Sequence, residues 1–80
     1  MSTLTVKFEA KAKDIHFAKG YMQVSLNDGR IIQVPLAYFP RLMNANSRQL
    51  NQWRLIGKGV GIHWEALDED ISVEGLLTSL

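Results

Sequence analysis

The chain has 80 residues, of which 46% are hydrophobic and 21% charged, with a formal net charge of +1 and no cysteine. This length predicts one domain, residues 1–80, with a small core, and it excludes a separate catalytic domain. Without cysteine, the fold cannot use a disulfide framework or a thiolate metal site. The N-terminus has no signal-peptide pattern, and no stretch approaches the roughly 20 apolar residues that cross a bilayer, so we expect a cytoplasmic protein without membrane contact.

The small net charge conceals an uneven distribution along the chain. Residues 1–58 contain all nine Lys and Arg but only three acids, a formal charge of +6, whereas residues 59–80 contain five acids and no base, a formal charge of −5. The five acids are Glu65, Asp68, Glu69, Asp70 and Glu74. Such a polarised chain is suited to recognising a charged partner, although the charges alone do not say which one.

Four stretches in the first half of the chain alternate apolar with polar residues, which is the period of a half-buried β-strand. Their apolar residues are Leu4, Val6 and Phe8; Ile15 and Phe17; Met22, Val24 and Leu26; and Ile32, Val34 and Leu36. The first two stretches could also form one continuous strand. The last two flank a glycine-containing turn and predict a β-hairpin.

The parity of the alternation determines the turn of this hairpin. A two-residue Asp-Gly loop would set apolar residues opposite polar ones. A three-residue loop over residues 27–29 instead places Val24 opposite Ile32, and it gives the loop glycine the left-handed position that such a turn requires. Pro35 cannot donate a ladder hydrogen bond, so the second strand should lie at an edge or leave the sheet there.

Helical spacing replaces alternation after the hairpin. Phe39, Leu42 and Met43 fall at i, i+3 and i+4, which predicts a short helix with a proline in its first turn. Ser47 is placed to cap a further helical turn. Both helical segments are therefore expected to be short.

Alternation resumes in the last third of the chain. Trp53 and Leu55 precede a Gly-Lys-Gly turn, and Ile62 and Trp64 follow it, which predicts a second hairpin. The acidic run from Asp68 to Asp70 is then expected to form a solvated loop. It leads to Ser72, which is placed to cap a last helix over residues 73–78.

The order of the predicted elements is β-β-β-α-β-β-α. This order favours an antiparallel sheet, made of the two hairpins and the N-terminal strand, with short helices packed on one side. The expected fold class is therefore α+β, in a small single domain. No internal repeat or linker is visible in the sequence.

Several segments in combination resemble a known family. Residues 28–42, DGRIIQVPLAYFPRL, contain a DGR turn and an FPRL motif, and residues 53–77, WRLIGKGVGIHWEALDEDISVEGLL, contain W-x-LIG, GIHW and DEDISVEGLL motifs. Together these spaced motifs resemble the stand-alone form of the bacterial family called domain of unknown function 2442.

The resemblance implies a small α+β domain, which occurs alone or joined to a helix-turn-helix DNA-binding domain. Some stand-alone members are similar to the antitoxin half of a two-gene system, whose other half is a small protein of another uncharacterised family. The resemblance implies no catalytic residues. Because the chain ends at Leu80, we expect no appended DNA-binding domain.

No set of residues in the sequence predicts catalysis. The Gly57-Lys58-Gly59 segment lacks the G-K-[ST] ending of a phosphate-binding loop and joins two predicted strands, so a hairpin turn is the better interpretation. His63 and Glu65 would share one face of a strand, but two ligands beside an acidic run give little support for a metal site. No nucleophile and base pair stands out. We expect a protein that is not an enzyme and holds no metal or cofactor.

The acidic run and one tryptophan form the first candidate site. Its residues are Asp68, Glu69, Asp70, Glu74 and Trp64. The carboxylates are expected to meet a basic protein partner, such as a small toxin-like protein that itself binds RNA, by occupying its phosphate sites. Trp64 is either an anchor of this interface or a core residue, because tryptophan is common in both settings. The predicted function is a non-enzymatic interaction module, antitoxin-like or adaptor.

A nucleic-acid interface on the basic side is the alternative. Its candidate residues are Arg41, Arg48 and Arg54. The Lys and Arg residues are scattered, and no aromatic RNA-binding motif accompanies them, so ordinary solvated faces explain most of them. The sequence identifies neither the partner nor the oligomeric state, and a homo-oligomer stays open.

Overall fold

The computed structural model describes residues 9–79 of the chain. Its elements are β1 (Ala12–Ala18), β2 (Tyr21–Leu26), β3 (Ile31–Pro35), η2 (Leu36–Tyr38), α1 (Pro40–Met43), α2 (Ser47–Leu50), β4 (Trp53–Ile56), η3 (Gly57–Gly59), β5 (Gly61–Trp64), β6 (Glu69–Ser72) and α3 (Val73–Ser79). The predicted alternation of Leu4, Val6 and Phe8 lies outside the described residues. Among the helices of residues 9–79, none has the length and apolar character needed to cross a membrane.

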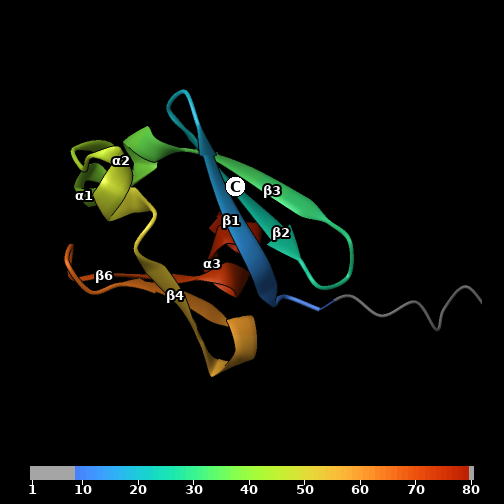
Figure 1. Ribbon diagram of the computed structural model, residues 1–80. Helices are drawn as coiled ribbons and strands as arrows, with labels where there is room; N and C mark the ends of the chain where they lie inside the picture. The colour runs from blue at the N-terminus through green and yellow to red at the C-terminus, as the bar shows by residue number, and fades with distance from the viewer. Residues whose placement is uncertain (1–8, 80) are drawn as a thin grey trace, which may run out of the picture.

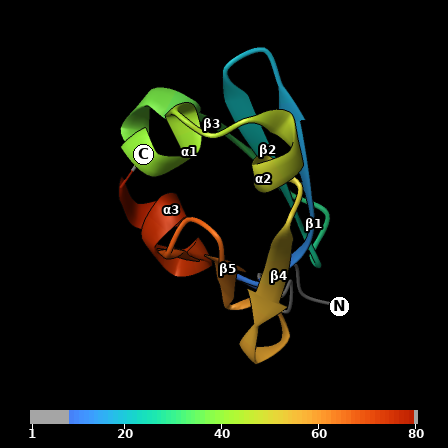
Figure 2. The ribbon, with the colours of Figure 1, turned by 60° about the vertical axis from the view of Figure 1, so that its left-hand side comes forward.

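Two antiparallel three-stranded sheets form the framework, in the orders β1-β2-β3 and β4-β5-β6. Figures 1 and 2 show the sheets as separate layers, joined by the segment that carries η2, α1 and α2. The predicted α+β class, antiparallel pairing and both hairpins are confirmed. The strands form two sheets where one was expected, and a further strand, β6, completes the second sheet.

The β2–β3 hairpin has the register that parity predicts. Val24 lies opposite Ile32, and the amide of Leu26 donates to the carbonyl of Arg30 at 2.8 Å. Gly29 has a φ of +95°, the left-handed conformation that the three-residue loop requires. Apolar side chains of both strands therefore share the face that packs on the core.

Asp28 ties this turn to its surroundings. Its carboxylate lies 2.8 Å from the guanidinium of Arg30 and accepts a hydrogen bond of 2.7 Å from the amide of Glu9. The pKa of Asp28 is lowered to about 2, and the side-chain hydrogen bond from Arg30 is the largest cause. The aspartate thus acts within the turn, as a structural residue.

The two short helices follow the prediction except at one cap. Pro40 is the first residue of α1, as expected. The cap of α2 is Asn46, whose side chain accepts from the amide of Gln49 at 2.8 Å, while the Gln49 side chain accepts from the amide of Asn46 at 3.1 Å. The prediction of Ser47 as the cap is wrong by one residue, because Asn46 and Gln49 form a reciprocal capping box.

The loop predicted for Asp68 to Asp70 is wrong for most of its length. Residues 69–72 form β6, antiparallel to β5, with Ile71 opposite Ile62. Ile71 is buried and Asp70 is exposed, which is the alternation of a strand with one face on the core. Pairing with β5 holds this acidic segment in a strand.

The predicted cap of the last helix is confirmed. The hydroxyl oxygen of Ser72 accepts from the amide of Gly75 at 3.1 Å, and α3 starts at the next residue after Ser72. Glu74 lies in the first helical turn, where a negative charge is favourable. The helix follows β6 directly and packs against it.

The η3 turn brings the second hairpin against β1. Gly59 has a φ of +103°, and a Cβ added there would lie 2.3 Å from the carbonyl oxygen of Ala12. Only glycine allows this approach of two backbones. Lys58, exposed at the tip of the turn, has a φ of 61°. The Gly57-Lys58-Gly59 segment is therefore a turn between two strands, as expected.

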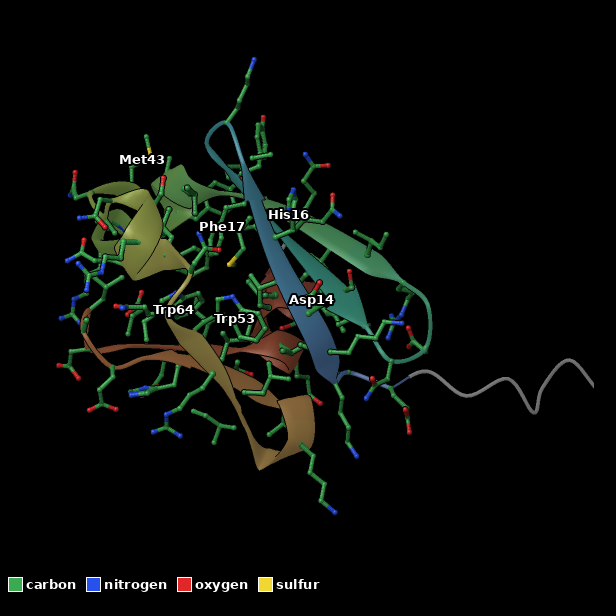
Figure 3. All side chains as sticks on the ribbon, viewed as in Figure 1. Asp14, His16, Phe17, Met43, Trp53 and Trp64 are labelled. Atoms are coloured by element: carbon green, nitrogen blue, oxygen red, sulfur yellow. The ribbon has the colours of Figure 1, made fainter. Side chains whose placement is uncertain are left out.

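One hydrophobic core joins the two sheets. Met22 from β2, Leu42 from α1 and Trp64 from β5 are all fully buried. The rings of Phe17 and Trp64 meet edge to face, with centroids 6.5 Å apart and planes at 65°. Figure 3 shows these two rings in the interior, whereas Met43 points away from α1.

Candidate functional site

Acidic side chains gather around β5, β6 and the start of α3. The side chains of Glu65 and Asp70 are 82% and 70% exposed, and Asp68 and Glu74 are exposed as well. We call Glu65, Asp68, Asp70 and Glu74 the acidic surface. The side chains of Asp68 and Glu74 make no hydrogen bond or ion pair with any other residue in the part of the chain that the structure describes. They are therefore available to a partner.

Trp64 does not belong to this surface. It is 0% exposed, and its Nε1 donates to the carbonyl oxygen of Leu50 at 2.9 Å. The interpretation of Trp64 as an interface anchor is therefore wrong. The strand parity explains the burial: Glu65 and His63 face outward, so the residue between them faces the core. A buried indole with its N–H satisfied is a structural residue.

Glu69 is also mostly buried and paired with another residue of the chain. Only 20% of its side chain is exposed, and Oε1 lies 3.8 Å from Nη1 of Arg41. The same guanidinium nitrogen donates to the carbonyl oxygen of Asp68. Two candidate residues from opposed hypotheses, Glu69 for a basic partner and Arg41 for nucleic acid, thus contact one another within the chain.

Two carboxylates hold the ring of His63. Asp70, in β6, lies opposite His63, in β5, and its carboxylate accepts a hydrogen bond from Nδ1 of the His63 ring. The other ring nitrogen, Nε2, lies 2.9 Å from Oε1 of Glu65. The hydrogen bond to Asp70, followed by that to Glu65, raises the pKa of His63 because both carboxylates favour the charged ring. The hydrogen bond from His63 and the charge of His63, and then the charge of Arg54, lower the pKa of Glu65.

The histidine cluster is not arranged as a metal site. Asp70 and Glu65 bind different nitrogens of the ring, on opposite sides, so their oxygens do not converge with the imidazole on one point. Within residues 9–79, no group of three or more His, Cys, Asp or Glu side chains is placed to hold a metal ion. The cluster instead links β5 to β6 by charge-assisted hydrogen bonds.

Two open grooves border β6. The first groove, of about 340 Å³, lies beside Ile71 and is walled by Tyr38, Phe39 and Leu76. The second groove, of about 440 Å³, lies beside Asp70 and Ser72 and is lined by Ile56, Val60 and Glu74 among others. Tyr38 is 61% exposed and Val60 49% exposed. Apolar side chains open to solvent therefore flank an acidic edge strand.

The three arginines of the nucleic-acid hypothesis do not form one patch of unpaired charge. Arg41 contacts Glu69, and Arg54 lies 3.6 Å from Glu65. Arg48 lies exposed on α2. Two of the three guanidiniums are thus partly neutralised by carboxylates, which weakens attraction to a phosphate backbone.

Comparison with known proteins identifies the family. The family model described as "Protein of unknown function (DUF2442)" matches residues 12–79. The chain belongs to the DUF2442 family. The resemblance seen in the spaced motifs is thereby confirmed, and the match includes every strand and helix described above. No curated protein matches the chain at a significant level.

Two solved structures are similar to this DUF2442 domain. One is a crystal structure of a protein of unknown function from Rhodospirillum rubrum, with a TM-score of 0.75, 29% identity, and coverage of 88% of this chain and 87% of that one. The other is a solution NMR structure of an uncharacterized protein from Chromobacterium violaceum, with a TM-score of 0.72 and 23% identity. The match covers 85% of this chain and 64% of that second protein. The likeness establishes the fold.

Sequence reasoning misses two features of this DUF2442 site. It places His63 and Glu65 on one face but does not bring Asp70 to them, because it does not predict β6. The polar and apolar alternation of Asp70, Ile71, Ser72 and Val73 is the signal that could have identified this strand. The grooves are different, because the first lies between η2, β6 and α3 and the second lies between the β4–β5 hairpin, β6 and α3. No local pattern predicts these contacts.

Proposed function

We propose that this chain is a non-enzymatic protein-interaction module of the cytoplasm, of antitoxin or adaptor type, which binds a basic partner protein through the acidic surface. The observation that carries the proposal is the position of the acidic surface beside two apolar grooves. Apolar contact surrounded by charge is a usual composition for a protein interface. The antitoxin or adaptor type rests on the family resemblance alone.

The acidic surface has a simple mode of action in this proposal. Its carboxylates occupy positions on the partner that otherwise hold phosphate groups, so the partner cannot bind nucleic acid at the same time. Within the described residues, Asp68 and Glu74 supply charge without an internal side-chain partner. His63 and Arg54 hold Glu65 in an ionised form. Complementary charge of this kind speeds association and selects the partner.

Purification of the tagged chain from its own cells tests the proposal. We expect one basic protein to co-purify in stoichiometric amount, identified by mass spectrometry. The variant Asp68→Asn with Glu74→Gln should lose it, because two free charges are removed while the contacts within the fold stay. Asparagine suits position 68, where φ is +51°.

A matched control is available at the other end of the chain. Glu9→Gln with Asp14→Asn removes the same charge from two exposed residues of the N-terminal part, and it should retain the partner. Equal recovery by both double variants would contradict the proposal. Recovery of nucleic acid in place of protein would favour the alternative function.

A further inference from the structure

We propose that the free edge of β6 receives an extended segment of the partner as an added β-strand, with basic and apolar side chains alternating along it. This inference rests on the proposed function and specifies how the basic partner is held. Within residues 9–79, β6 is the last strand of its sheet, so one row of its backbone groups has no neighbouring strand in that part of the chain. Strand addition uses such a row for main-chain hydrogen bonds.

The ladder between β5 and β6 shows which groups face outward. The amide of Val73 donates to the carbonyl of Val60 at 3.0 Å, and hydrogen-bonded pairs recur at every second residue of an antiparallel ladder. The bonded pairs therefore include Ile71, whereas Asp70 and Ser72 direct their amides away from β5. Within residues 9–79, no acceptor outside this sheet receives a hydrogen bond from either amide, and both point away from β5.

The edges of the other sheet carry features that oppose strand addition. In β3, the position of Pro35 has no amide hydrogen to offer. In β1, the register shifts between Ala12 and Asp14, which is a bulge that bends the edge. β4 is the other edge strand of the second sheet, but both grooves described above border β6.

The two grooves suit the side chains of an added strand. Successive side chains of a strand point to opposite faces. Both grooves are lined by Asp70, Ile71 and Ser72 of β6, and they differ in the neighbour that forms the other wall: η2 and α3 for the first groove, the β4–β5 hairpin for the second. The first groove, beside Tyr38 and Leu76, would take an apolar side chain. The second groove has Glu74 and Asp70 in its lining and would take a Lys or Arg whose stem lies on Val60.

The charges at the two ends of β6 favour a basic segment. Asp68 immediately precedes the first residue of β6, and Glu74 follows its last residue by two positions. Both side chains are exposed, and Asp70 lies between them on the strand. An extended segment with Lys or Arg at alternate positions would meet a carboxylate at the middle and near each end of its path.

A display library of random seven-residue peptides, selected on the immobilised full chain, provides the probe. We expect enriched peptides to alternate Lys or Arg with apolar residues. N-methylation of every second amide of the best peptide then tests the hydrogen bonds: in one register binding should fall by about tenfold or more, and in the other it should change by less than about twofold. Asp68→Asn with Glu74→Gln should weaken the unmodified peptide about fivefold or more.

Hydrogen exchange in the free and bound chain locates the added strand. The amides of Asp70 and Ser72 should exchange rapidly in the free chain and at least about tenfold more slowly with peptide bound. The amide of Ile71, which faces β5, should be protected in both states. This amide serves as the internal control.

Other results would overturn the inference. If methylation acts equally in both registers while the charge variant still weakens binding, strand addition fails and the proposed function stands. If no peptide is enriched, strand addition fails and the co-purification test decides the proposed function. If the charge variant binds the peptide as well as the original chain does, both fail. Protection of the Asp70 amide in a free chain that sediments as a dimer would assign the edge to a second copy instead of a partner.

Discussion

Arg41, in α1, forms an ion pair of 3.8 Å with Glu69, in β6, and also donates to the carbonyl oxygen of Asp68. This contact joins the basic part of the chain to the acidic part. It removes one guanidinium from the basic side and one carboxylate from the acidic side. The charge separation seen in the sequence is consequently smaller on the folded molecule, and the free acidic charge lies on the acidic surface.

Replacing Arg41 tests whether this contact holds the helical segment on β6. Arg41→Met keeps an apolar stem but removes both interactions, so the free energy of unfolding should fall by about 1 kcal/mol. Urea denaturation measures the change. Arg48→Met, on α2, is the control and should change the value by less than about 0.5 kcal/mol. Equal effects of the two substitutions would contradict a specific contact.

Trp64 should be essential to the fold. Trp64→Phe leaves the carbonyl of Leu50 without its donor and opens space in the core, so unfolding free energy should fall by about 2 to 3 kcal/mol. Trp53 is only half-buried, and Trp53→Phe should cost about 1 kcal/mol or less. Urea denaturation of both variants checks this order. Unchanged stability of the Trp64 variant would contradict this structural role.

The β4–β5 hairpin is predictable from local sequence, but the place of its turn in the fold is not. Period-two alternation around Gly57-Lys58-Gly59 predicts the hairpin. The near contact between Gly59 and Ala12 arises only when two distant segments pack together. In the same way, the burial of Trp64 depends on the Leu50 carbonyl, which α2 supplies from another part of the chain.

Gly59→Ala should destabilise the fold much more than Gly20→Ala. Both glycines have positive φ, but an added Cβ at Gly59 would meet the Ala12 backbone, whereas nothing lies within 4 Å of one at Gly20. Gly20→Ala should lower the unfolding free energy by about 1 kcal/mol and Gly59→Ala by about 3 kcal/mol. Thermal and urea denaturation can compare them. Similar losses would indicate that η3 does not press on β1.

The acidic strand shows why part of the site cannot be predicted by composition. Glu69 and Asp70 suggest a solvated loop when they are considered alone. Their segment becomes a strand because Ile71 packs in the core and β5 supplies a ladder. This tertiary pairing brings Asp70 to His63, so the histidine cluster follows from β6 and cannot be predicted without it.

Stability should decrease with rising pH because of His63. Folding raises the pKa of His63. The folded chain therefore holds the imidazole proton more tightly than the unfolded chain, in which the pKa of histidine is about 6.5. This contribution is complete below the unfolded pKa and is lost as pH rises through the folded pKa. Glu65 has the opposite sign: its lowered pKa stabilises the fold above its ordinary pKa, and this stabilisation is lost as pH falls.

Urea denaturation at about pH 6 and about pH 9 separates the contribution of His63 from other groups. The difference in unfolding free energy between the original chain and His63→Gln should be larger at the lower pH. His16→Gln, which replaces the other histidine, exposed on β1, is the control for the loss of a histidine side chain. An equal loss at both pH values for His63→Gln would contradict the raised pKa.

The affinity of the co-purified basic protein, measured by calorimetric titration at about 50 mM and about 300 mM salt, tests the binding role of the acidic surface most directly. For the original chain and for Glu9→Gln with Asp14→Asn, we predict the same affinity and a fall of about tenfold at the higher salt. Asp68→Asn with Glu74→Gln should bind about tenfold more weakly at low salt and show a smaller salt dependence. Equal affinity and equal salt dependence of all three chains would contradict binding through the acidic surface.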